Sequence, residues 1–229
     1  MSTDKGQDKN DKNKSRIVIV DDHPIVREGL SDLINKEDDL AVCGEAEDGQ
    51  GAMAVIKELE PDIAIVDISL QETSGLELIK DLKVQHPSMP VLALSMYEES
   101  LYAERVLRAG AKGYIMKREA TKNVVMAIRK VLSGQLYLSE KMAITLVDKL
   151  VGGKADASSS PIDRLTDREL EVFSMLGHGK GTRQISERLH LSVKTIETYR
   201  SRIKEKLNLA SGSELLQHAF QWINNRGKG

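Results

Sequence analysis

The segment PDIAIVDISL, residues 61–70, constrains the fold of this chain more than any other stretch. Its unbroken apolar run, residues 63–66, is typical of a strand that is buried on both faces. The run ends in Asp67, and a carboxylate is costly to bury in an apolar core. We therefore expect Asp67 at the carboxyl end of the strand, on the rim where open α/β sheets bind ligands. Taken alone, this segment fits a ligand-binding Asp and an ordinary loop-capping Asp equally well.

The same pattern of apolar run and amphipathic segment repeats around residues 61–70. In the first amphipathic segment, for example, Ile25, Leu30 and Ile34 are predicted to lie near one face of a helix. Such alternation predicts an α/β fold with a doubly wound, five-stranded parallel sheet and helices on both faces. Right-handed crossovers then place every strand's carboxyl end on one rim. Strands are expected at 16–20, 40–46, 63–67, 91–95 and 113–117, and helices at 23–37, 49–60, 74–86, 98–109 and 121–133.

The residues at these strand ends predict one site. Each has an ordinary explanation by itself, as a strand-end acid, a loop hydroxyl or a surface amine. Together they bring three carboxylates, a hydroxyl and an ammonium group to one rim, where the carboxylates repel one another. A divalent cation with oxygen ligands, Mg²⁺ in particular, is the natural compensation. The residues are Asp21 and Asp22 after the first strand, Asp67 after the third, Ser95 after the fourth and Lys117 after the fifth.

This set resembles the receiver domain of two-component response regulators, which has a flavodoxin-like fold. The resemblance extends from residue 16 to about residue 135. One departure is the loop ISLQETSG after Asp67, which lacks the Met-Pro pair of many receivers. In this resemblance Asp21 and Asp22 are the acidic pair, Asp67 is the phosphoacceptor with Gly75 eight residues later, Ser95 and Tyr114 are the switch residues, and Lys117 is the characteristic lysine.

The resemblance implies a mechanism. Asp67 would attack the phosphohistidine of a sensor histidine kinase, while Mg²⁺ and Lys117 stabilise the transferred charge. Mg²⁺ would be held by Asp22, Asp67 and the backbone carbonyl of Ser69, with Asp21 acting mainly through water. Ser95 would then move toward the phosphoryl oxygens and Tyr114 would turn inward. Tyr114 also fits the simpler description of a half-buried strand tyrosine.

Charge and composition divide the chain. We expect a disordered tail at 1–14, a receiver domain at 15–135, a partly helical linker at 136–160 and a second domain at 161–229. Residues 15–160 contain 17 Lys and Arg against 24 Asp and Glu, a net charge of −7. Residues 161–229 contain 12 against 8, a net charge of +4, which favours nucleic acid as the partner of this half.

The segment 161–229 predicts a helix-turn-helix. Thr166 and Glu169 form a capping-box pattern before a helix, and a short helix follows from Thr182. Ser192 then caps a longer amphipathic helix, whose apolar stripe begins with Val193. A short helix, a tight turn and a longer helix with a basic polar face is helix-turn-helix geometry, although solvated helical hairpins have similar patterns.

These residues resemble the LuxR-type DNA-binding domain over 161 to about 225, with Thr182 where Asn is frequent in that family. With the receiver, the chain resembles a response regulator of the NarL/FixJ type. Glu197 on the reading face would either accept a hydrogen bond from cytosine N4 or repel wrong registers. The resemblance places Glu197, Thr198 and Ser201 at base edges and Lys194, Thr195, Arg202, Lys204 and Lys206 mostly at phosphates.

The combined prediction is a cytoplasmic transcription regulator that is switched by phosphorylation of Asp67 and binds double-stranded DNA as a homodimer. RNA polymerase is a further candidate partner. No apolar run approaches the ~20 residues that span a membrane, and Cys43 is the only cysteine, so no intramolecular disulfide forms. The alternatives are a phosphorylation-independent LuxR-type factor and a Mg²⁺-dependent phosphohydrolase. The latter would want a second acid where Ser69 stands, so we expect no enzyme beyond slow self-dephosphorylation.

Overall fold

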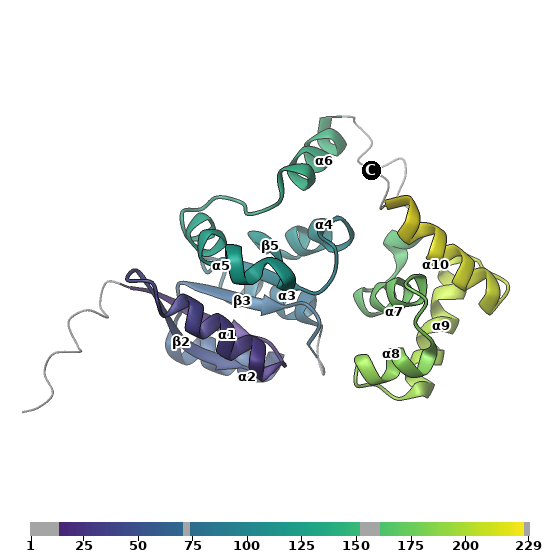
Figure 1. Cartoon of the computed structure of the whole chain (residues 1–229), viewed down its shortest axis with the longest axis horizontal. Helices are drawn as coiled ribbons and strands as arrows, with labels where there is room; N and C mark the ends of the chain where they lie inside the picture. The colour runs from purple at the N-terminus through teal and green to yellow at the C-terminus, as the bar shows by residue number, and fades with distance from the viewer. Residues whose placement is uncertain (1–13, 71–73, 152–160, 227–229) are drawn as a thin grey trace, which may run out of the picture. The chain divides into compact units, whose positions relative to one another are not determined.

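The computed structural model describes residues 14–70, 74–151 and 161–226. Its contacts divide the chain into two compact units, one up to Leu146 and one from Val147 onward. Residues 1–13 of the predicted tail and residues 152–160 of the predicted linker lie outside the described residues. Figure 1 shows the elements of both units. In the described part of the chain, no helix is long and apolar enough to cross a membrane.

The first unit is a parallel sheet of five strands with the order β2-β1-β3-β4-β5, surrounded by helices (Figure 1). The predicted fold class is therefore confirmed. The strands are β1 (Ser15–Val20), β2 (Leu40–Ala46), β3 (Ile63–Asp67), β4 (Val91–Ser95) and β5 (Gly113–Met116). The helices are α1 (Pro24–Ile34), α2 (Gly49–Leu59), α3 (Gly75–Gln85), α4 (Glu99–Ala109) and α5 (Lys117–Leu132).

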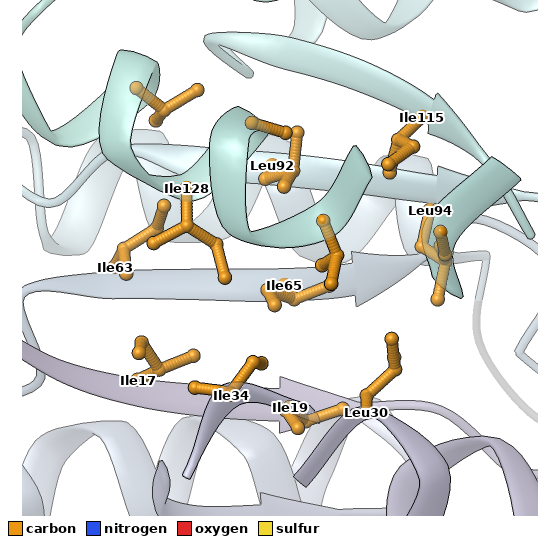
Figure 2. Close-up of a cluster of buried hydrophobic side chains, with 14 of the residues drawn as sticks. Ile17, Ile19, Leu30, Ile34, Ile63, Ile65, Leu92, Leu94, Ile115 and Ile128 are labelled. Atoms are coloured by element: carbon orange, nitrogen blue, oxygen red, sulfur yellow. The ribbon is translucent and has the colours of Figure 1, made fainter. Parts of the chain in front are cut away.

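One face of this sheet packs under α1 and α5. Figure 2 shows Leu30 and Ile34 of α1 and Ile128 of α5 lying over the strands. Every residue of β3 is buried, as its unbroken apolar run requires. The strand residues in this cluster are Ile17, Ile19, Leu40, Ile63, Ile65, Leu92, Leu94 and Ile115.

Two predictions for this unit are wrong in detail. Ile25, expected near the buried face of α1, is 83% exposed because it lies in the first turn, beyond the core contacts of Leu30 and Ile34. Lys117 was expected to end the fifth strand, with a helix from residue 121. Instead β5 ends at Met116 and α5 begins at Lys117. The rim lysine is therefore the first residue of a helix, which fixes its backbone more firmly than a loop would.

The segment after α5 is attached to the edge of the sheet. Tyr114 of β5 donates its backbone N–H to the Tyr137 carbonyl at 2.9 Å, and Tyr137 donates to the Lys112 carbonyl at 3.0 Å. The buried Glu99 carboxylate of α4 accepts the Ser139 N–H at 2.8 Å. Ser139 stands directly before α6 (Glu140–Val151), so the start of this helix is bonded to β5 and α4.

The second unit consists of short helices: η2 (Pro161–Arg164), α7 (Asp167–Gly177), α8 (Thr182–Arg188), α9 (Val193–Leu207) and α10 (Gly212–Arg226). Thr166 and Glu169 form the expected capping box at α7, and Ser192 caps α9. Val193 is 47% exposed, so its predicted place on the buried stripe is wrong. As the first residue of α9 it lies beyond the core that holds Phe173, Ile185, Ile196, Ile203, Leu207 and Leu215.

Candidate functional site: an acidic rim and a helix-turn-helix surface

The rim of the first unit contains a buried ion triad. Asp21 follows β1 and Asp67 ends β3, and both carboxylates are fully buried. The Lys117 ammonium, at the start of α5, lies 2.7 Å from Asp21 Oδ2 and 2.7 Å from Asp67 Oδ2. Residues 21, 67 and 117 are far apart in the chain, and the parallel crossovers bring them together as the strand-end pattern predicted.

Burial and charge shift the pKa values in this triad. Burial raises the pKa of Asp67 to about 6, against the opposing effect of the Lys117 ammonium. Burial alone would lower the pKa of Lys117, but the Asp67 and Asp21 carboxylates outweigh it and raise that pKa. Lys117 is therefore a permanent cation that points at the candidate nucleophile.

Asp22 and His23 complete a group of four possible metal ligands. Ligand atoms of Asp21, Asp22, His23 and Asp67 all lie within 4.8 Å of one another. The His23 Nδ1 is 2.7 Å from Asp22 Oδ1 and 3.1 Å from Asp21 Oδ1. Three carboxylates against one lysine leave excess negative charge, which suits a divalent cation with oxygen ligands. Sequence reasoning missed His23, although its position directly after the acidic pair was a usable signal.

The backbone around Asp67 is held from two directions. The Ser69 N–H donates to Asp67 Oδ1 at 3.0 Å. The role of the Ser69 carbonyl as a Mg²⁺ ligand stays a prediction. Gly75 at the start of α3 packs directly on the strand end, because a Cβ there would lie 1.9 Å from the Asp67 carbonyl oxygen. Only glycine lets α3 approach so closely. The glycine at residue 75 is thus a packing requirement.

The side chains of Ser95 and Tyr114 both form hydrogen bonds with the backbone of Tyr97. Ser95 Oγ, fully buried at the end of β4, accepts the Tyr97 N–H at 2.9 Å. The Tyr114 hydroxyl donates to the Tyr97 carbonyl at 2.8 Å, and the Tyr114 side chain is buried. Burial raises the pKa of this phenol above its ordinary value, so it stays neutral. The Tyr97 ring stacks on Tyr102 with centroids 4.9 Å apart. The Tyr114 side chain therefore lies inward in this structure.

In the second unit, α9 presents most of the predicted DNA-contacting side chains to solvent. Lys194, Glu197, Thr198, Ser201 and Arg202 are exposed, whereas Thr195 and Lys204 are half-buried. The Thr195 hydroxyl lies 2.8 Å from Ser192 Oγ, within the helix cap. The Thr198 hydroxyl donates to the Lys194 carbonyl at 3.0 Å.

Lys206 has a different environment from the other predicted phosphate contacts. Its ammonium lies 2.6 Å from Oε2 of Glu169, whose side chain is buried. The same oxygen accepts the Thr166 N–H at 2.7 Å. Burial would raise the pKa of Glu169, but these hydrogen bonds outweigh it and lower that pKa. Lys206 therefore joins α9 to α7, and its DNA contact stays a prediction.

Both units match known families. Residues 17–129 match the response regulator receiver domain, and residues 163–219 match the bacterial regulatory proteins of the luxR family. The oxygen regulatory protein NreC of Staphylococcus carnosus is 38% identical over 210 residues, which are 90% of this chain and 97% of that protein. NreC of Staphylococcus epidermidis is 36% identical over 211 residues, again 90% and 97% of the two chains.

Solved structures of response regulators are also similar to this chain. RcsB from Salmonella enterica serovar Typhimurium, bound to the promoter P1flhDC with the phosphomimetic BeF3-, is 25% identical with a TM-score of 0.59. The match covers 90% of this chain and 98% of that chain. A LuxR-family two-component response regulator from Aurantimonas is 33% identical with a TM-score of 0.56, over 60% of this chain and 99% of that one.

Proposed function

The chain belongs to the two-component response regulators of the NarL/FixJ type, which join a receiver domain to a LuxR-type DNA-binding domain, and we propose that Asp67 is the phosphoacceptor that controls it. The observation that carries this assignment is the buried Asp21–Lys117–Asp67 triad at the strand ends. A buried ion pair contributes little net stability, whereas a buried ammonium beside a carboxylate suits stabilisation of the charge on a transferred phosphoryl group. As a family member, the chain is a phosphorylation-activated, DNA-binding transcription regulator.

The proposed reaction is phosphoryl transfer from a histidine of a sensor kinase. A carboxylate oxygen of Asp67 forms the new bond to phosphorus, the phosphorus–nitrogen bond breaks, and its electron pair leaves with the kinase imidazole. Asp22, Asp67 and the backbone carbonyl of Ser69 would hold Mg²⁺ directly, and Asp21 would hold it mainly through water. The bound ion would neutralise charge on the transferred group. The 2.7 Å contact of Lys117 with Asp67 supports the same role for its ammonium. Self-dephosphorylation would be slow, and we propose no other catalysis.

The phosphoryl group would be sensed through Ser95. If Ser95 Oγ moves toward a phosphoryl oxygen in order to donate to it, the 2.9 Å hydrogen bond that Oγ accepts from the Tyr97 N–H would lengthen or break. Tyr97 also accepts the Tyr114 hydroxyl through its carbonyl, so both side chains hold the same residue. Movement of Ser95 would therefore alter the backbone between β4 and α4. This consequence makes Ser95 and Tyr114 the proposed switch residues.

The second unit would bind double-stranded DNA with α9 in the major groove. The exposed Lys194 and Arg202 would meet phosphates, while Glu197, Thr198 and Ser201 would face base edges. DNA-bound RcsB structures include one that contains two RcsB dimers, and we propose a homodimer for the phosphorylated form of this chain too. RNA polymerase remains a proposed further partner, and the cytoplasm the proposed location.

Phosphorylation by a small acyl phosphate tests the assignment. Wild-type protein with Mg²⁺ and acetyl phosphate should gain one phosphoryl group in intact-mass spectra, and Asp67→Asn should gain none. EDTA should abolish labelling of the wild type. Asp62→Asn is the matched control, because Asp62 is another carboxylate of the same segment that lies at the opposite end of β3 and should leave labelling unchanged. Equal labelling of wild type and Asp67→Asn would refute the assignment.

A further inference from the structure

Glu197 of the proposed recognition helix is held by two side chains that the sequence did not connect to it. The Thr182 hydroxyl, at the start of α8, donates to Glu197 Oε1 at 2.9 Å. The Arg200 guanidinium donates through Nη1 to the same oxygen at 2.8 Å and also to the Thr182 oxygen. The three residues form a closed hydrogen-bonded group between α8 and α9. Glu197 is exposed, whereas Arg200 is mostly covered.

This group leaves one carboxylate oxygen unused. Both hydrogen bonds that Glu197 accepts go to Oε1, and among the described residues no hydrogen bond or ion pair reaches Oε2. A carboxylate oxygen can only accept, so the natural partner for Oε2 in a major groove is an exocyclic amino group. Of the four bases, cytosine N4 offers such a donor without a neighbouring acceptor on the same base edge. A thymine O4 or a guanine O6 would meet it with repulsion.

Charge explains why a carboxylate is tolerated at this position. A bare carboxylate beside DNA is repelled by the phosphates, which dominate binding energetics. The Arg200 guanidinium at 2.8 Å offsets that charge, and its Nη2 lies near Gly212 at the start of α10. The Thr182 hydroxyl adds a contact from a different helix, which restricts the rotation of the Glu197 side chain. Both contacts favour a fixed acceptor over a mobile negative charge.

We propose that Thr182 and Arg200 are positioning residues that present Glu197 Oε2 to a cytosine, so that this group determines sequence specificity at one position of each half-site. The proposal rests on the DNA-binding function proposed above. It also selects between the two roles that the sequence left open for Glu197: reading a base, and general repulsion of wrong registers. Repulsion alone would require neither the interhelical hydroxyl nor a neutralising guanidinium.

Selection from randomised double-stranded DNA tests the proposal with the full-length, acetyl-phosphate-treated protein. Wild type should enrich a site with a strong cytosine preference at one position per half-site. Glu197→Ala should lose that preference, a loss of about tenfold on the scale of one base contact, and Thr182→Val should weaken the preference by less than that. Preferences at the other positions should persist. In the Glu197→Ala background, Thr182→Val should have no further effect, because Thr182 acts only through Glu197.

Two controls separate positioning from folding. Thr182→Ser keeps the hydroxyl and should keep the cytosine preference. Ser186→Ala removes a hydroxyl of the same helix that bonds only within α8, to the Arg183 carbonyl, and should also leave the preference intact. An enriched wild-type site with an unchanged preference in Thr182→Val would overturn this inference alone. A wild type that enriches no sequence would overturn the proposed function and this inference with it.

Discussion

At the scale of single residues, the tightest constraint in the receiver is the contact between Gly75 and the backbone of Asp67. A Cβ at residue 75 would meet three backbone atoms within 2.8 Å, including the Asp67 carbonyl oxygen at 1.9 Å. Backbone atoms cannot turn aside as a flexible side chain can. Gly75→Ala should therefore lower the free energy of unfolding by about 2–3 kcal/mol, the upper range for overpacking, and should slow phosphorylation of Asp67. Urea denaturation and the labelling rate measure the two effects.

Gly29 supplies the matched control. It lies on the exposed side of α1, and a Cβ there would meet nothing within 4 Å. Gly29→Ala should thus raise the free energy of unfolding by about 0.5–1 kcal/mol, because alanine loses less backbone entropy in a helix. The two substitutions add the same methyl group with opposite expected signs. Equal effects of both would mean that the close approach of α3 to β3 does not exist in solution.

The raised pKa of Asp67 predicts a pH dependence of Mg²⁺ binding. If Mg²⁺ binds Asp67 as proposed, protons compete with the ion for this carboxylate. The affinity for Mg²⁺ should then be flat at neutral pH and fall as the pH drops through about 6, the raised pKa of Asp67. Below that value the loss should approach about tenfold per pH unit, since one proton competes with each ion. Calorimetric titration with MgCl₂ at several pH values measures this affinity. Asp67→Asn should bind Mg²⁺ more weakly, and its affinity should not fall near pH 6. A wild-type affinity that is constant down to pH 5, one unit below the pKa, would contradict the prediction.

The sequence indicated most of these residues because strand ends in a parallel sheet share a rim. Asp21, Asp67 and Lys117 followed from that rule without any knowledge of distances. An inward Tyr114 was expected only from the family resemblance. The His23 contact and the Thr182–Glu197–Arg200 group were not predicted, because contacts between side chains that are distant in the sequence leave no periodic pattern in it. Thr182 appeared in the sequence as the start of a helix and as a departure from a frequent Asn, and its proposed positioning role rests on the contact with Glu197.

At the scale of elements, hydrophobic periodicity located the strands and helices but failed at their ends. Ile25 and Val193 have the right spacing for a buried stripe, yet both lie in first turns that extend beyond the core. The start of α5 at Lys117 was missed because the pattern Tyr114–Met116 suggested a longer strand. Periodicity also did not reveal that Tyr137 and Ser139 bind β5 and α4, since backbone pairing at a sheet edge depends on where the chain returns.

Substitution of Lys206 distinguishes between two roles of this side chain: a contact with a DNA phosphate and a link between α9 and α7. It joins α9 to the buried Glu169 of α7 at 2.6 Å. Lys206→Ala should lower the free energy of unfolding of the second unit by about 1–2 kcal/mol, less than for a fully buried pair because a third of the lysine is exposed. Because the folded-state pKa of Glu169 is lowered, this stabilisation is present at neutral pH and is lost as the pH falls through that pKa.

The fluorescence of Trp222, the only tryptophan, follows unfolding of this unit in urea. Lys194→Ala is the control, since Lys194 is exposed on the same helix and should change DNA affinity without changing stability. If Lys206→Ala leaves the unfolding midpoint unchanged at neutral pH and weakens DNA binding as Lys194→Ala does, Lys206 is a phosphate contact after all.

At the scale of the whole molecule, the chain joins a unit of net charge −7 to one of net charge +4, counted over residues 15–160 and 161–229. If the acidic unit attracted the basic unit, it would compete with DNA for the basic surface. The sequence alone predicted this division, because charge counts need no coordinates. This division of charge also leads to the expectation that the unphosphorylated receiver restrains DNA binding.

Removal of the acidic unit should therefore mimic phosphorylation. A fragment of residues 161–229 should bind a selected DNA site more tightly than the unphosphorylated full-length chain at low salt, as measured by fluorescence anisotropy. Added salt screens the attraction of the basic unit for DNA and for the acidic unit, with a Debye length of about 8 Å at physiological ionic strength. The difference in DNA affinity between fragment and full-length chain should therefore narrow as the salt concentration rises. Acetyl phosphate should tighten binding by the full-length chain and leave the fragment unaffected, because Asp67 is missing. A fragment that binds no better than the unphosphorylated chain at any salt concentration would mean that phosphorylation acts by building a dimer, with no restraint to release.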